Sequence, residues 1–295
     1  AAFGQREYPR EELEERWKRV LFNQFHDVIS GVCIERVHCE AAESYRAVIA
    51  ACADSIAGAL AFLAVPDGAG LFSIVNSLPW TRRVVVRVPE GILSPDLAEG
   101  AELPVLVDGQ ARRLRIQRLG TNLWVEAELP PCGWTTVSLD EVGHFLAADG
   151  PDSQLNTEGV VLEATGDEDW ILENRFLRVT IDALGRLVSI FDKEEGWELA
   201  AGPCNELRMY RDVTVCYDAW DISQFYEKVP VELPSVAQRE VVAPGGSLFA
   251  ALRVERHLSD RSVLLQEIRL ERDSRRIDFR TVVEWQEDHK LLKVT

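Results

Sequence analysis

The sequence predicts an α+β protein, in which an N-terminal α-helical hairpin precedes a mainly antiparallel β-sandwich region. Apolar residues recur every three or four positions up to residue 66, and a Pro-Asp-Gly-Ala-Gly turn follows at residues 66–70. Beyond this turn the chain alternates short β-rich runs with turn residues. We therefore expect a helical domain at residues 1–66 and a β-sandwich region at residues 67–295.

The helical part contains two predicted helices, at residues 11–30 and 34–64. Acidic residues fill the first turns of the first helix, where the helix dipole favours them, and Gly31 is a stop signal. The apolar seam of the second helix is Ile34, Val37, Ala41, Tyr45, Val48, Cys52, Ile56, Ala59 and Leu63. The short connection predicts an antiparallel hairpin. One hairpin leaves an apolar face over, so we expect it to be part of a larger helical bundle.

The β region begins with six short runs between residues 71 and 139. Residues 140–160 are rich in Asp, Gly, Pro and Ser, and we expect them to divide two sub-sheets. Residues 176–181 and 186–191 predict a hairpin, and longer strands are predicted at 237–243, 248–258, 262–271 and 276–285. Because the intervening turns are short, neighbouring strands should be antiparallel.

The two chain ends suggest that the sequence is part of a longer one. The first residue is not Met, and residues 290–295 predict a strand that is still in progress. We therefore expect the β region to be truncated at its C-terminus.

The charge balance limits the partners. The chain has 32 Lys+Arg against 49 Asp+Glu, a net charge of −17, so a phosphate-binding surface and a nucleic-acid partner are not expected. The most apolar run, residues 57–65, is shorter than the ~20 residues of a membrane-spanning helix, so we expect no membrane partner. The six cysteines form no CxxC pair, which favours reduced thiols and a cytoplasmic protein.

The densest polar cluster is Asn23-Gln24-Phe25-His26-Asp27. An imidazole can ligate a transition metal, and an adjacent carboxylate can bind a cation or sugar hydroxyls. From residue types alone, the simpler interpretation is a helix-capping His26 and a solvated Asp27, since a zinc site needs at least three protein ligands. A local zinc site formed with Cys33, His38 and Cys39 is not expected, because helix neighbours lie about 100° apart.

Five motifs in order resemble glycoside hydrolase family 38, the retaining α-mannosidases, and most closely its cytosolic-type branch. They are LFNQFHDVISGVCIERVHCEAAESY at residues 21–45, VNSLPW at 75–80, LENRFLRV at 172–179 followed by GRL at 185–187 and DK at 192–193, DAWDI at 218–222, and WQEDHKLLKV at 285–294. Each motif alone is a weak signal, but together they cover nearly the whole chain.

The resemblance implies specific roles for a few residues. It implies that His26 is a metal ligand, usually of zinc, and that Asp27 hydrogen-bonds the mannose ring. It further implies that Asp218, Trp220 and Asp221 lie near the substrate, although a sheet-capping loop with Trp220 in packing stays an open alternative. His289 is interpreted as a strand-end residue that packs or bonds locally, and His38, His144 and His257 as surface or satisfied core residues.

The resemblance also implies what this chain lacks. In the family, the nucleophile, the acid/base and the other metal ligands belong to an N-terminal α/β domain that nothing here matches. The chain would thus be a fragment of a metal-dependent enzyme that hydrolyses terminal α-mannosidic bonds, with no catalytic residue of its own. It would be inactive alone and bind zinc weakly or not at all.

The expected partners are a mannose-containing oligosaccharide and the N-terminal catalytic domain, and a homo-oligomer stays open. Two alternatives to the fragment remain. One is a stand-alone carbohydrate-binding or scaffold β-sandwich module, and the other is a different glycosidase family with a β-sandwich appendage.

Overall fold

The computed structural model describes residues 7–63, 71–88, 102–107, 110–138, 159–166, 168–217 and 220–295. The chain divides into two compact units. The helical unit comprises Ala1–Pro66 together with Thr214–Asp221, and the β unit comprises Asp67–Val213 and Ile222–Thr295. Each unit is described by itself below.

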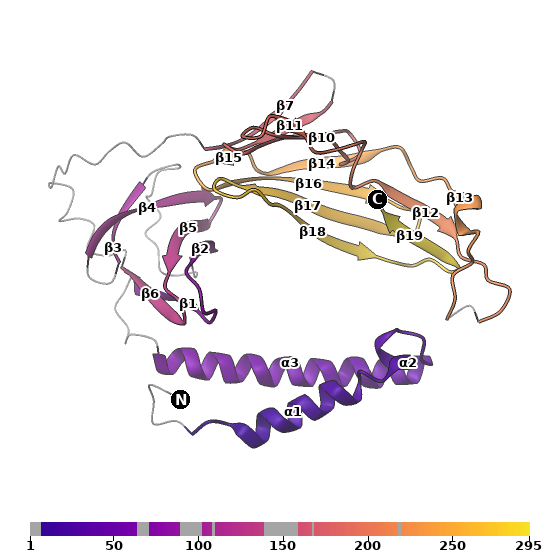
Figure 1. Ribbon diagram of the computed structural model, residues 1–295, viewed down its shortest axis with the longest axis horizontal. Helices are drawn as coiled ribbons and strands as arrows, with labels where there is room; N and C mark the ends of the chain where they lie inside the picture. Colours follow the sequence, from indigo (N-terminus) through magenta and orange to yellow (C-terminus); the bar gives the residue numbers. More distant parts are fainter. Residues whose placement is uncertain are drawn as a thin grey trace. The chain divides into compact units, whose positions relative to one another are not determined.

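The helical unit contains α1 (Arg10–Phe22), α2 (His26–Ile29) and α3 (Glu35–Leu63). Figure 1 shows α1 and α3 side by side with opposite chain directions. Arg16 Nη1 of α1 donates a hydrogen bond to Ser55 Oγ of α3 at 2.8 Å. The predicted antiparallel helical hairpin is therefore confirmed.

The single helix predicted at residues 11–30 is wrong in one respect, because it breaks after Phe22. Asn23 is the C-cap of α1, and the amide groups of Gln24 and Phe25 donate to carbonyls only three residues back. Phe25 then adopts an extended backbone, with φ −52° and ψ 138°, from which α2 starts. The apolar spacing continues across the break and so did not reveal it. Gly31 is left-handed at φ 79°, as a stop signal requires.

The apolar seam of α3 is buried only in part. Ala41 and Val48 are buried, whereas Ile34 and Ile56 stay exposed. A helix rises 1.5 Å per residue, so the 13 residues of α1 extend about 20 Å along the 29 residues, about 44 Å, of α3. Within the described residues, α1 is too short to cover the seam.

The expectation that no segment could span a membrane needs a correction. Over Glu35–Phe62, α3 is long and apolar enough to cross a membrane by length and composition alone. The search for a contiguous apolar run does not reveal this, because polar residues such as Arg46, Asp54 and Ser55 interrupt the run. The core helix of a larger soluble domain meets the same criterion, so the absence of a membrane partner stays a prediction.

The β unit starts with a six-stranded antiparallel sheet in the order β1-β6-β3-β4-β5-β2. The strands are β1 (Leu71–Asn76), β2 (Arg82–Arg87), β3 (Glu102–Val107), β4 (Gln110–Leu119), β5 (Asn122–Leu129) and β6 (Gly133–Ser138). Its core contains the fully buried side chains of Ile116, Val125 and Val137.

Most of the remaining strands form a sandwich of two sheets. One sheet has the order β11-β10-β9-β8-β7-β15 and the other β14-β16-β17-β18. Leu172, Val179 and Ile181 of the first sheet pack with Leu252 and Ile268 of the second in one core, and all five are fully buried. The strands are β7 (Val160–Ala164), β8 (Trp170–Glu173), β9 (Leu177–Ile181), β10 (Leu187–Asp192), β11 (Trp197–Glu198), β14 (Ala237–Ala243), β15 (Gly245–Gly246), β16 (Phe249–His257), β17 (Val263–Glu271) and β18 (Ile277–Glu284).

A further, smaller sheet has the order β13-β12-β19, from Pro230–Val231, Leu207–Arg211 and Lys290–Val294. Its inner side chains Leu207 and Met209 pack with Leu258 and Leu264. A 3-10 turn, η1 (Tyr226–Lys228), precedes β13.

The sheet that contains β1 to β6 is joined to the sandwich through the side chain of Gln117. Its carboxamide donates to the Phe249 carbonyl at 2.8 Å and accepts from the Leu248 and Phe249 amides at 3.0 and 2.9 Å. A Cβ added at Gly246 would lie only 2.7 Å from the Gln117 side chain, so glycine is required there. Trp124 packs edge-on against Phe249 beside this contact.

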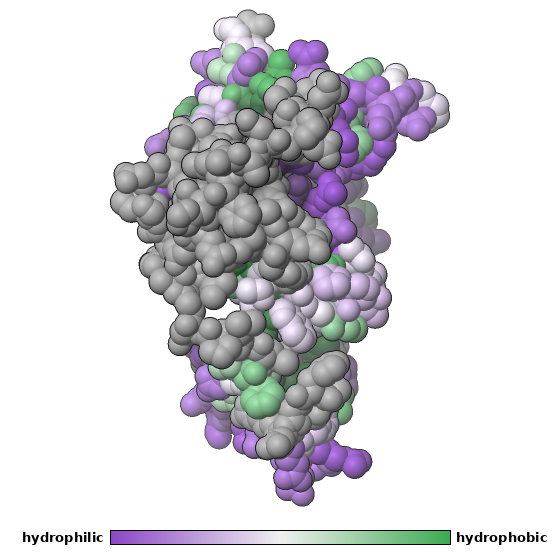
Figure 2. Space-filling view, turned by 90° about the vertical axis from the view of Figure 1, so that its left-hand side faces the viewer, coloured by the Kyte–Doolittle hydropathy of each residue, from purple (hydrophilic) through white to green (hydrophobic). Residues whose placement is uncertain are grey.

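The predicted α+β class with a mainly antiparallel β-sandwich is confirmed, and β14, β16, β17 and β18 match their predicted ranges to within a residue or two. Most of the predicted divide at residues 140–160 lies outside the described residues. All six cysteines are free. On the face drawn in Figure 2, hydrophilic and hydrophobic residues are interspersed over the described surface.

Candidate functional site

His26 and Asp27 are the first two residues of α2. The extended Phe25 backbone ends the preceding turn, and its carbonyl accepts from the Val28 and Ile29 amides at 2.9 and 3.0 Å. The helix break described above therefore places both side chains at the start of a new helix. This position favours a carboxylate, because the first amide groups of a helix lack helical acceptors.

The His26 side chain is 73% exposed. Its ring lies 4.3 Å from the Phe25 ring, centroid to centroid and tilted by 47°. Its Nε2 lies 3.4 Å from Asp27 Oδ1. An imidazole that is exposed and packed on one side is open to a ligand on the other.

Asp27 is less exposed, with 32% of its side chain accessible. Its Oδ1 is buried and, among the described residues, accepts no hydrogen bond. An unpaired buried polar atom costs about 1–3 kcal/mol, and more when it is charged. A hydroxyl or a cation from outside the described residues would remove this cost.

The described residues do not complete a metal site. Among them, no group of three or more His, Cys, Asp and Glu side chains is placed to hold a metal ion. His38 is instead engaged locally, with Nε2 3.0 Å from the Gly31 carbonyl oxygen. His26 can supply one imidazole ligand, and the Asp27 oxygen that accepts no hydrogen bond among the described residues fits a cation or a polyol beside it.

Trp220 and Asp221 belong to the helical unit, as His26 and Asp27 do, through the segment Thr214–Asp221. Their amide groups both donate to the Tyr217 carbonyl, at 2.7 and 2.9 Å, from a turn in which Tyr217 has φ 59°. Trp220 is 64% exposed, so a pure packing role has no support within the described residues. Asp218 lies outside the described residues.

Residues outside the predicted site hold the chain just before this segment. The Asp212 amide donates to the His289 carbonyl at 2.8 Å, and His289 is left-handed with φ 49°. Its neighbour Glu287 is buried among polar groups. The sequence signal for this arrangement was a carboxylate, Glu287, two residues before His289 in the short connection between two strands.

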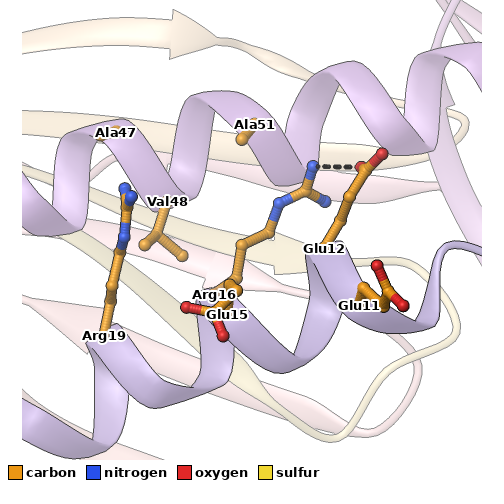
Figure 3. Close-up of a pocket in the computed structure, with 8 residues that line it drawn as sticks. All are labelled: Glu11, Glu12, Glu15, Arg16, Arg19, Ala47, Val48 and Ala51. Atoms are coloured by element: carbon orange, nitrogen blue, oxygen red, sulfur yellow. Dashed lines mark hydrogen bonds and ion pairs between the residues drawn. The ribbon is translucent and has the colours of Figure 1, made fainter.

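The hairpin also carries a groove away from the predicted residues. Figure 3 shows it between α1 and α3, lined by Glu11, Glu12, Glu15, Arg16, Arg19, Ala47, Val48 and Ala51. Glu12 and Arg16 are paired at 3.0 Å. This pairing within one helix is a common surface feature, and none of the predicted site residues lines the groove.

Two protein-family models match the helical unit and the C-terminal part of the β unit, and both describe parts of glycoside hydrolases. Residues 1–63 match the family model described as the alpha mannosidase middle domain. Residues 172–295 match the one described as the glycosyl hydrolases family 38 C-terminal domain. The chain belongs to glycosyl hydrolase family 38.

Curated relatives agree with this assignment. "Alpha-mannosidase 2C1" of Homo sapiens is 30% identical over 293 residues, which cover 97% of this chain and 24% of that protein. "Alpha-mannosidase G" of Dictyostelium discoideum is 23% identical over 308 residues, which cover 95% of this chain and 27% of that protein. The chain thus spans about a quarter of the length of these relatives.

Proposed function

We propose that this chain is the part of a retaining, metal-dependent α-mannosidase that completes the sugar site but does not supply the reacting carboxylates. The enzyme hydrolyses terminal α-mannosidic bonds of a mannose-containing oligosaccharide. The observation that carries the proposal is the exposed His26 imidazole beside a buried Asp27 oxygen that accepts no hydrogen bond among the described residues, within a segment that matches the family's middle domain.

His26 is the metal ligand in this proposal. Its exposed ring leaves a nitrogen free to bind zinc or another divalent ion, and the remaining ligands come from a domain outside this sequence. When bound, the metal orients sugar hydroxyls as a Lewis acid. With a single imidazole, the chain alone holds zinc weakly or not at all.

Asp27 accepts hydroxyl groups of the mannose ring, because its buried oxygen lacks a protein donor among the described residues. Trp220 and Asp221, with Asp218, form part of the wall beside the sugar. The exposed indole can cover an apolar sugar face, while the carboxylates accept hydroxyl groups.

The nucleophile and the acid/base lie outside this chain in the proposal. Retaining hydrolysis needs two carboxylates about 5–5.5 Å apart. The relatives are about four times as long as the matched region, which leaves room for a domain that carries both. This N-terminal domain is the chain's main partner, and a homo-oligomer is a further one.

The protein works in the cytoplasm in this proposal. The six free cysteines, which form no disulfide, support a reducing compartment.

The test is metal content and hydrolysis of p-nitrophenyl α-mannoside by the full-length protein that carries this sequence. We expect His26→Ala to lower kcat/KM by at least about 100-fold and to lose bound metal, because one ligand is removed. His257→Ala is the matched control, since its side chain is also exposed, at 56%, but lies in the β unit.

An active, metal-loaded His26→Ala variant would contradict the metal role. A full-length protein that binds the oligosaccharide but never cleaves it would favour the alternative, a stand-alone carbohydrate-binding module.

A further inference from the structure

α2 is a helix of four residues, His26–Ile29, and it carries both central residues of the proposed site, His26 and Asp27. A helix of about one turn is not stable alone, because forming the first turn fixes several residues for few hydrogen bonds. None of the residues of α2 is buried, so packing does not hold it either. The position of His26 and Asp27 therefore depends on the groups that bond to the ends of α2.

The C-terminal end of α2 is closed by a Schellman motif. Gly31 is left-handed at φ 79° and donates its amide to the Val28 carbonyl at 3.1 Å. The Val32 amide donates to the Asp27 carbonyl at 3.2 Å. These two hydrogen bonds, with a left-handed glycine between them, define the motif. Because α2 is so short, the motif that ends the helix also holds the backbone of Asp27.

The backbone of His26 is held from the same side. Ser30 Oγ, at the C-cap of α2, donates to the His26 carbonyl at 2.6 Å. Residues 30–32, which we call the α2 cap, thus bond to the carbonyl groups of both site residues. A displacement of the α2 cap would displace His26 and Asp27 with it.

His38 connects the α2 cap to the long helix α3. It lies in the first turn of α3, and its Nε2 is 3.0 Å from the Gly31 carbonyl oxygen. Since a carbonyl oxygen can only accept, Nε2 carries the proton and donates the hydrogen bond. In the described part of the chain, no other side chain of α3 forms a hydrogen bond with residues 26–32. The imidazole is therefore the side-chain link between the 29-residue helix and the short one.

We propose that His38 is a positioning residue for His26 and Asp27, acting through the Gly31 carbonyl and the α2 cap. It contacts neither the sugar nor the metal. When the His38–Gly31 hydrogen bond opens, the cap loosens and the short helix that presents the metal ligand frays. The effect on the metal rests on the proposed function, whereas the effect on the cap does not.

The first measurement is amide hydrogen exchange at Gly31 and Val32 in the full-length protein, read by mass spectrometry of short overlapping peptides. His38→Ala removes the donor to Gly31. We expect exchange at both amides to become about two- to tenfold faster, as for the loss of one solvent-accessible hydrogen bond. The His38 side chain is exposed, so the variant should fold.

The second measurement is zinc affinity of the same variant, by competition with a chelator. We expect it to fall by a similar factor of about two to ten, because His26 is held in its binding position for a smaller fraction of the time. Hydrolysis of p-nitrophenyl α-mannoside should fall at limiting zinc and recover at saturating zinc, since every metal ligand is still present. General damage to the fold would not be reversed by zinc.

His38→Gln tests the hydrogen bond itself, because the amide nitrogen of glutamine can replace Nε2 as the donor. Exchange and zinc affinity should return to within about twofold of the unmodified protein. Glu40→Ala is the matched control. Glu40 is also exposed near the start of α3 and also makes one side-chain hydrogen bond, from Arg36 at 2.9 Å, but this bond stays within α3. It should leave exchange at Gly31 and Val32 and zinc affinity unchanged.

Unchanged exchange at Gly31 and Val32 in His38→Ala would overturn the proposal, as would an equal acceleration in Glu40→Ala or no recovery in His38→Gln. Faster exchange with an unchanged zinc affinity would overturn the link to the metal ligand. A full-length protein that binds no zinc and cleaves no mannoside would refute the proposed function, while the exchange measurement would still decide whether His38 holds the α2 cap.

Discussion

The helical unit and the β unit each hold a carboxylate next to a basic side chain, and the two carboxylates differ in what surrounds them. Asp27 lies 3.4 Å from an exposed imidazole and has a buried oxygen without a hydrogen bond among the described residues. Glu287 is enclosed and accepts from two hydroxyls and one ammonium. The difference teaches that the β unit satisfies the carboxylate of Glu287 with its own donors, whereas the helical unit leaves an Asp27 oxygen open to a ligand.

The first way to sharpen this comparison is to truncate one apolar side chain in each unit. Leu172→Ala should lower the free energy of unfolding of the 295-residue chain by about 2–5 kcal/mol, because Leu172 is fully buried in the sandwich core. Ile29→Ala should change it by less than about 0.5 kcal/mol, because Ile29 is 65% exposed. Urea unfolding measures both. An equally large loss for Ile29→Ala would mean that the helical surface is covered in solution.

The second test concerns Asp27 itself. In the full-length protein, Asp27→Asn should lower kcat/KM by about 10- to 100-fold while leaving the melting temperature unchanged or slightly raised. The physical reason is that the native Oδ1 accepts no hydrogen bond among the described residues, so the fold loses only its 3.4 Å contact with the exposed His26 ring.

Asp54→Asn is the matched control for Asp27→Asn, since Asp54 is an exposed acid on α3. A marked loss of stability in Asp27→Asn alone would show that the oxygen has a protein partner after all.

The smallest expected effect is on acid stability, and it tests the other side of the comparison. The folded-state pKa of Glu287 is lowered from 4.5 to about 2, so its contribution to stability is present above pH 4.5 and is lost as the pH falls toward 2. Glu287→Gln should therefore flatten the loss of stability between pH 4.5 and 2, measured as the difference from the unmodified protein. Identical slopes would contradict the lowered pKa.

Much of the fold could be predicted because the patterns are local. Alternation along β16, β17 and β18 and the short turns between them define antiparallel neighbours without further information. The break between α1 and α2 could not be predicted in this way. Apolar residues keep their helical spacing through Phe25, although α1 already ends at Phe22 and the extended backbone of Phe25 separates it from α2.

The candidate site was predicted through resemblance more than through spacing. His26 and Asp27 are adjacent, so the sequence suffices to bring them together, but one imidazole does not define a metal site. Contacts between segments that are far apart in sequence could not be predicted. The Asp212–His289 hydrogen bond joins residues that are far apart in sequence and uses backbone atoms, which every residue type has.

The Gln117 contact has a consequence for how the β unit could be divided. The sheet that contains β1 to β6 contacts the sandwich through the buried Gln117 carboxamide, the closely approached Gly246 and the Trp124–Phe249 aromatic pair. All of these contacts are non-covalent. The covalent connection between them runs through residues 139–158. A polypeptide cut there would still carry both halves of the recognition surface, so the two pieces have the attributes of a fragment-complementation pair.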